Sequence, residues 1–123
     1  MKKLLFIICL LFTVTSVSQI IGTTYKLDSI EIAQYDLPTE VTWYNAKREC
    51  EELGKGWRLP TQEELHQMYN NKDLIGNFVN TNYWTSTVYN FDYAWMQVFT
   101  HGFIAITSKQ GYINARAVKT IKN

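Results

Sequence analysis

The stretch with the sequence GWRLPTQEEL constrains the fold more than any other part of this chain. Gly54 and Gly56 can adopt the positive φ with which many helices end. Pro60 biases the residue before it toward extended backbone, so a preceding helix cannot continue through it. Thr61 and Glu64 have the spacing of a capping box, in which a hydroxyl and a carboxylate satisfy free amides at a helix start. The stretch therefore predicts a corner between two helices.

The segments on both sides of this corner have helical periodicity. The first helix is predicted after Thr42, a good N-cap residue, and the second from Gln62 to about Asn70. Apolar residues of the first helix recur at spacings of three, four and three, which places them on one face: Trp43, Ala46, Cys50 and Leu53.

The remaining segments predict strands. An Asn-rich, irregular loop is expected from Asn71 to Tyr83, and a turn at His101 and Gly102. Strand character is found in residues 25–35, 83–88, 94–100, 103–107 and 112–119. Because the helices are separate from a run of consecutive antiparallel strands, the sequence predicts an α+β domain.

The N-terminus has the three-part pattern of a secretory signal peptide. A basic start is followed by an apolar run and by small residues, with a plausible cleavage before Gln19. The apolar run is shorter than the roughly 20 residues of a membrane helix. We therefore expect a signal peptide at 1–18 and a mature domain at 19–123, without a membrane span after cleavage. The protein is expected to be secreted, periplasmic or on the cell surface.

Charge and cysteine content exclude several functions. The sequence has 12 basic and 11 acidic residues, and removal of Lys2 and Lys3 leaves a nearly neutral chain. Such a chain lacks the clustered positive charge that nucleic acid requires. Cys50 is then the only cysteine, so neither an intrachain disulfide nor a cysteine zinc site is possible. We predict that Cys50 is buried as a small apolar residue.

Taken in order, the motifs resemble the bacterial Lcl C-terminal domain-like family over residues 40–119. The resemblance implies a C-type-lectin-like fold, with two helices packed on a small antiparallel sheet and a long loop region that carries binding. It also implies an exported binding module. The motif residues are predicted to be structural, with the tryptophans in the core and the arginines in ion pairs: Trp43, Cys50, Trp57, Arg58, Pro60, Thr61, Glu64, Trp84, Trp95 and Arg116.

The sequence departs from calcium-dependent lectins and from enzymes. Calcium prefers six to eight oxygen ligands, whereas Asp73 and Asp92 are the carboxylates of residues 70–93. His66 and His101 have no cysteine or acidic cluster at ligand spacing. We therefore predict no metal, no cofactor and no catalysis.

The loops of residues 70–93 are the predicted ligand-binding surface. Aromatic rings can pack on the C–H groups of a sugar while amides reach its hydroxyls, so a glycan is the first hypothesis. The same residue types suit a protein-binding surface, which makes a protein-interaction or structural component of the cell envelope the alternative. A third reading is that the rings only anchor the loop. The oligomeric state stays open. The candidate residues are Asn80, Asn82, Tyr83, Tyr89, Asn90, Phe91, Asp92 and Tyr93.

Overall fold

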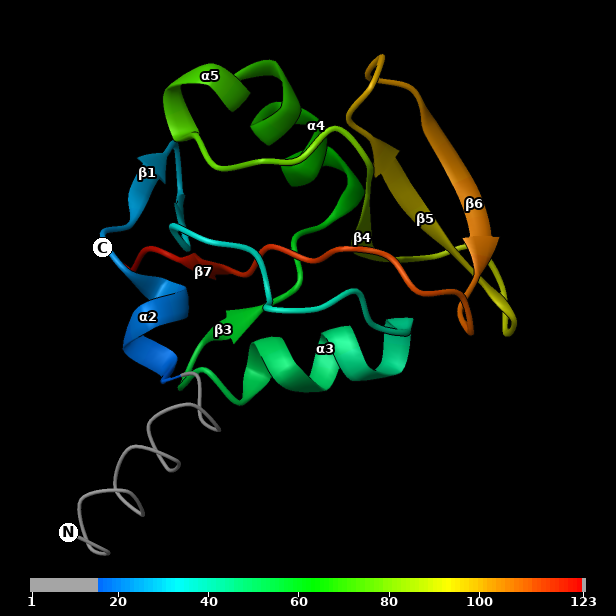
Figure 1. Ribbon diagram of the computed structural model, residues 1–123, viewed down its shortest axis with the longest axis horizontal. Coiled ribbons are helices and arrows are strands. Elements are labelled where there is room, and N and C mark those ends of the chain that lie inside the picture. Colours follow the sequence, from blue (N-terminus) through cyan, green and yellow to red (C-terminus); the bar gives the residue numbers. More distant parts are fainter. Residues whose placement is uncertain (1–15, 123) are drawn as a thin grey trace, which may run out of the picture.

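The computed structural model describes residues 16–122 and has the predicted α+β architecture (Figure 1). In Figure 1 the longer helices α3 and α4 lie on different sides of the molecule, and β4, β5 and β6 form a separate group at its right. The elements are α2 Val17–Ile21, β1 Tyr25–Leu27, β2 Ile30–Ile32, α3 Trp43–Glu51, β3 Trp57–Arg58, α4 Gln62–Asn70, α5 Lys72–Ile75, β4 Asn82–Val88, β5 Tyr93–Val98, β6 Ile104–Ser108 and β7 Val118–Thr120.

Within residues 16–122 the strands form two antiparallel sheets. The first has the order β1-β2-β7-β3, so strands from both ends of the chain are neighbours. The second, β4-β5-β6, is a simple meander. Single bridges from Val41 to Ile113 and from Tyr83 to Asn114 lie outside these ladders. The segment before β7 thus contacts both the α3 region and the second sheet.

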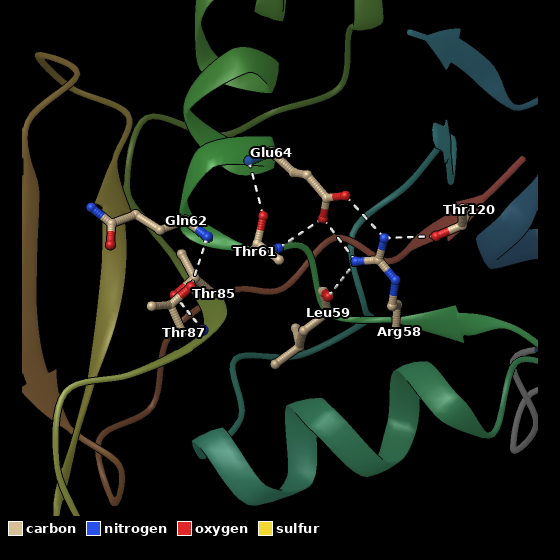
Figure 2. Close-up of polar contacts among 8 residues, drawn as sticks. All are labelled: Arg58, Leu59, Thr61, Gln62, Glu64, Thr85, Thr87 and Thr120. Carbon is tan, nitrogen blue, oxygen red and sulfur yellow. Dashed lines mark hydrogen bonds and ion pairs between the residues drawn. The ribbon is translucent and has the colours of Figure 1, made fainter. Parts of the chain in front are cut away.

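The predicted corner forms as expected. Gly54 and Gly56 have φ values of 144° and 90°. Thr61 caps α4, and the Glu64 carboxylate accepts the Thr61 amide hydrogen in a capping box. Figure 2 shows the Arg58 guanidinium facing the Glu64 carboxylate, with N–O distances of 2.7 and 2.9 Å. The same guanidinium donates to the Thr120 hydroxyl, so the corner is tied to β7. The ion pair predicted for Arg58 is confirmed.

This ion pair predicts a pH effect. Hydrogen bonds from Arg58 lower the pKa of Glu64 below its ordinary value of 4.5. A depressed carboxyl pKa adds stability above the unfolded-state pKa, and this stability is lost as the pH falls through the folded-state pKa. We expect Glu64→Gln to cost about 1 kcal/mol at neutral pH and much less in acid. Urea unfolding at several pH values measures this difference, and a cost independent of pH would contradict it.

The buried apolar side chains of residues 16–122 form two core clusters. The first contains Trp43, Cys50, Trp57 and Trp84 and includes the apolar face of α3. The second includes Tyr83 and the apolar face of α4. The Cys50 side chain is fully buried, as predicted, and burial raises the pKa of its thiol to about 12. This thiol is therefore protonated at neutral pH.

Several segments differ from the sequence predictions. The expected strand at 25–35 is a hairpin, β1 and β2, that turns at Asp28, whose φ is 52°. The expected loop at 71–83 contains a short helix, α5. The expected strand at 112–119 pairs as a strand only from Val118, and its first part makes single bridges at Ile113 and Asn114.

The predicted signal peptide lies largely outside the described residues. Of residues 1–18, the structure describes only 16–18, and the predicted cleavage before Gln19 falls within α2. Ile20 of this helix is buried in the first core cluster. Among residues 16–122, no helix is long and apolar enough to cross a membrane.

Candidate functional site

The predicted surface of residues 70–93 is divided in two by β4. The loop of residues 76–81 precedes this strand, and the turn of residues 89–92 follows it. A seven-residue strand is about 20 Å long, so these loops lie at its opposite ends. Asn80, which is exposed, and Asn82, which is partly buried, are therefore separated from the aromatic residues of the turn.

Tyr83 is a core residue and does not face solvent. Its hydroxyl donates to Asp36 at 2.6 Å and accepts the Val79 amide hydrogen at 3.0 Å. Burial and the neighbouring Asp36 carboxylate raise its pKa. The assignment of Tyr83 to the ligand-binding surface was therefore wrong. Tyr83 faces α4, whereas Trp84 faces the α3 side, so both faces of the strand are covered at this point.

The turn between β4 and β5 brings the other five candidates together on the surface. The side-chain Oδ1 atom of Asn90 accepts the backbone amide hydrogens of Asp92 and Tyr93 at 2.9 Å each, so this side chain stabilises the turn. The Phe91 side chain is 83% exposed and the Tyr89 side chain 55%. Asn90, Asp92 and Tyr93 are exposed as well. The turn therefore presents three aromatic rings to solvent.

Two of these rings, those of Tyr89 and Tyr93, lie on one face of the second sheet, next to Trp95. The Tyr89 and Trp95 rings meet edge to face with centroids 5.8 Å apart. Trp95, predicted to lie in the core, is only partly buried. Alternation along β5 places Tyr93 beside Trp95, and the β5–β6 register pairs Trp95 with Ile106. Ile104 follows two residues earlier on β6. We call this surface the aromatic face: Tyr89, Tyr93, Trp95, Ile104 and Ile106.

A cleft of about 680 Å³ lies at the end of the aromatic face, where α4 approaches the start of β6. Ile104 belongs to both the cleft and the aromatic face. The apolar part of the cleft comes from Phe103 and Ile104, and its polar part from amide, carboxylate and imidazole groups of α4. The lining residues are Gln62, Glu63, His66, Gln67, Gly102, Phe103 and Ile104.

The sequence does not predict this cleft. Gln62 and His66 are four residues apart on α4 and thus share a face, which the sequence shows. The position of Phe103 opposite them depends on the packing of β5 against α4. A hydrogen bond of 3.2 Å between His66 and the buried Gln97 of β5 accompanies this packing.

The titratable side chain of His101, which lies near this surface, makes a hydrogen bond within the fold. The Nδ1 atom of His101 accepts the Phe103 amide hydrogen at 3.1 Å, within the turn before β6. Among residues 16–122, no group of three or more His, Cys, Asp or Glu side chains is placed to hold a metal ion. What this region offers a ligand is aromatic and aliphatic surface beside amides.

Arg116 holds the loop at the other end of β4. The side chain is fully buried, its Nε donates to Asp36 at 2.8 Å, and its two terminal nitrogens donate to the carbonyls of Gly76 and Asn77. Its guanidinium also lies 4.1 Å from the centroid of the Phe78 ring. Burial raises the pKa of Asp36, and Arg116 opposes this rise. The ion pair predicted for Arg116 is confirmed, and its buried guanidinium is not open to a ligand.

Comparisons with known proteins identify the family and the fold. The family model of the Lcl C-terminal domain matches residues 22–119. EMS16, an antagonist of the collagen receptor integrin alpha2beta1, has a similar structure, with 15% identity, a TM-score of 0.58, and coverage of 79% of this chain and 96% of EMS16. Botrocetin has 11% identity and a TM-score of 0.61, with coverage of 80% and 97%. The fold is therefore C-type-lectin-like, as predicted. No curated protein matches the sequence.

Proposed function

Because the chain belongs to the Lcl C-terminal domain family, we propose that it is an exported, non-catalytic module that binds a cell-surface glycan through the aromatic face and the adjoining cleft. This proposal is based on one observation: the exposed aromatic rings adjoin a cleft that is lined by amide side chains. The signal-peptide pattern of residues 1–18 supports export.

The composition of this surface suits a sugar polymer. Ligand sites typically have volumes of roughly 300–1,000 Å³ and combine apolar walls with a few polar groups, as this cleft does. The amides of Gln62 and Gln67 can both donate and accept hydrogen bonds, which matches sugar hydroxyls. The Glu63 carboxylate disfavours a polyanion. A neutral glycan is thus the ligand class that this surface supports best.

A protein partner is the alternative, and one observation favours it. Aliphatic side chains are exposed beside the rings: Ile104 and Ile106 by 40% each. Aromatic and aliphatic residues without charge are typical of the centre of a protein interface. EMS16, a protein of this fold, acts on a protein receptor. A protein-interaction or structural component of the cell envelope would use the same surface.

The test is binding of the purified protein to a broad glycan array, with and without a calcium chelator. We expect chelator-insensitive binding to one class of sugar. Tyr89→Ala and Tyr93→Ala should each weaken binding ~tenfold, because a ring of an exposed contact surface is lost. Their free energies of unfolding should change by no more than about 0.5 kcal/mol, as for other exposed positions.

Tyr35→Ala is the matched control, because Tyr35 is 44% exposed and follows β2, in the other sheet. Equal loss of binding in this control would contradict the proposed site. Strong destabilisation by Tyr89→Ala would show that this ring anchors the turn. An array without any signal would favour the protein partner, and crosslinking on cells would then be expected to trap one discrete protein.

A further inference from the structure

Among residues 16–122, strand β6 forms an unprotected edge of the second sheet. It pairs with β5 on one side, and no other described strand pairs with its second side (Figure 1). Proteins usually protect such edges with charged residues or proline. The five residues of β6 include neither. The next residue, Lys109, is buried, and its Nζ lies 4.6 Å from the centroid of the Trp43 ring.

The register shows which backbone groups of β6 point outward. The Val98 amide donates to the Phe103 carbonyl at 2.9 Å, and Met96 is paired with Ala105. Because the hydrogen-bonding direction alternates along an antiparallel strand, Phe103 and Ala105 use their backbone groups toward β5. The N–H and C=O groups of Ile104 and Ile106 therefore point toward the open edge.

The outward segment Ile-Ala-Ile is symmetric about Ala105. We propose that β6 pairs antiparallel with β6 of a second copy of this chain, around a two-fold axis at Ala105. In this register Ile104 lies opposite Ile106 of the partner subunit, and the symmetric pair forms on the other side of the axis. Each of these pairs joins residues whose backbone groups point outward, so each can exchange two hydrogen bonds.

The side chains fit this register as well as the backbone does. Ile104 and Ile106 point to the same face, so the two copies place four isoleucines side by side, which removes their exposed aliphatic surface from water. No charged side chain of β6 faces its own copy, so pairing of like with like carries no repulsion. A strand of another protein would need aliphatic side chains opposite Ile104 and Ile106, whereas a second copy supplies them by symmetry.

Pairing would also join the two ligand surfaces. Ile104 lines the cleft, so Ile106 of the partner subunit would lie at the edge of that cleft. The aromatic faces of both copies would then lie on one face of a continuous six-stranded sheet. This last consequence rests on the proposed function, whereas the pairing itself is independent of any ligand. A polymer could contact both faces and gain avidity.

Sedimentation equilibrium of the purified protein without ligand, from micromolar to near-millimolar concentration, tests the pairing. We expect a monomer–dimer equilibrium. Hydrogen exchange of the Ile104 and Ile106 amides should slow as the concentration rises, while the Ala105 amide, bonded to β5, should be protected throughout. Ile106→Lys should raise the dissociation constant ~tenfold or more, because it places a charge on the uncharged interface.

Two further variants separate pairing from folding. Ile106→Pro removes one outward N–H group, which is tolerated at a free edge but not in a paired strand, so it should also weaken the dimer. Val79→Lys, a change of the same kind at a 46% exposed loop position, should leave the dimer unchanged. A monomer at every concentration would overturn the proposal, and so would a dimer that Ile106→Lys and Ile106→Pro do not weaken. Neither result depends on glycan binding, so both are independent of the proposed function.

Discussion

Replacement of Arg116 by methionine is expected to lower the free energy of unfolding by about 3–5 kcal/mol, because it leaves the Asp36 carboxylate with a buried, unpaired charge. Arg116 is fully buried and its guanidinium donates to Asp36 and to three backbone carbonyls. Methionine fills much of the volume but donates no hydrogen bond. The carbonyls of Gly76 and Asn77 then also lose their donor.

The pH dependence of this loss provides a second readout. Without Arg116, burial raises the pKa of Asp36 further, and the hydrogen bond from Tyr83 opposes this rise only in part. A carboxyl group whose folded-state pKa lies above its unfolded-state value favours folding in acid, and this advantage disappears as the pH rises through the folded-state pKa. The cost of Arg116→Met should therefore be larger at pH 7 than at pH 4. Urea unfolding at both pH values measures it.

The double variant Arg116→Met/Asp36→Leu is the control for this interpretation. It removes both charges, so it should recover part of the stability that Arg116→Met loses. If the double variant is as unstable as the sum of its single changes, the unpaired carboxylate is not the cause. A cost below about 1 kcal/mol for Arg116→Met would contradict the structural role of the ion pair.

The corner and the two helices beside it, α3 and α4, were predictable from sequence because their causes are local. Thr61 and Glu64 are three residues apart, and Arg58 reaches Glu64 from six residues away. Arg116 and Asp36 are 80 residues apart, so an ion pair could be predicted from the arginine, but its partner could not. The same limit applies to the cleft, which joins residues of α4 to Phe103.

The candidate site was predicted in part, for a geometric reason. Residues 89–93 gather in one short turn, which the sequence indicates through its polar and aromatic composition. Asn80 and Asn82 were grouped with residues 89–93 because they are close in sequence. However, the predicted strand separates these two residues from the turn by about 20 Å. Tyr83 was misassigned because a strand covered on both faces buries consecutive residues, and the helix that covers Tyr83 is not apparent from its neighbours.

Replacement of Trp84 by alanine is the second change with a large expected effect, about 3–5 kcal/mol, because it empties the middle of the first core cluster. Trp84 is fully buried on β4, and its indole N–H donates to the Val41 carbonyl at 2.8 Å. Its backbone amide donates to the Asn114 carbonyl. The residue thus holds the second sheet against the segments beside α3.

Trp84→Phe separates the two contributions of this side chain. Phenylalanine retains most of the apolar surface but removes one of the two donors to the Val41 carbonyl, which still accepts the Ile113 amide hydrogen. We therefore expect a cost of about 1–3 kcal/mol, smaller than that of alanine. Urea unfolding compares the two variants. If both cost the same, the hydrogen bond and not the packing would dominate at this position. If Trp84→Ala costs less than about 1 kcal/mol, the second sheet does not depend on this contact, and the support of the aromatic face would have to come from the corner, where the Ser86 amide donates to the Pro60 carbonyl.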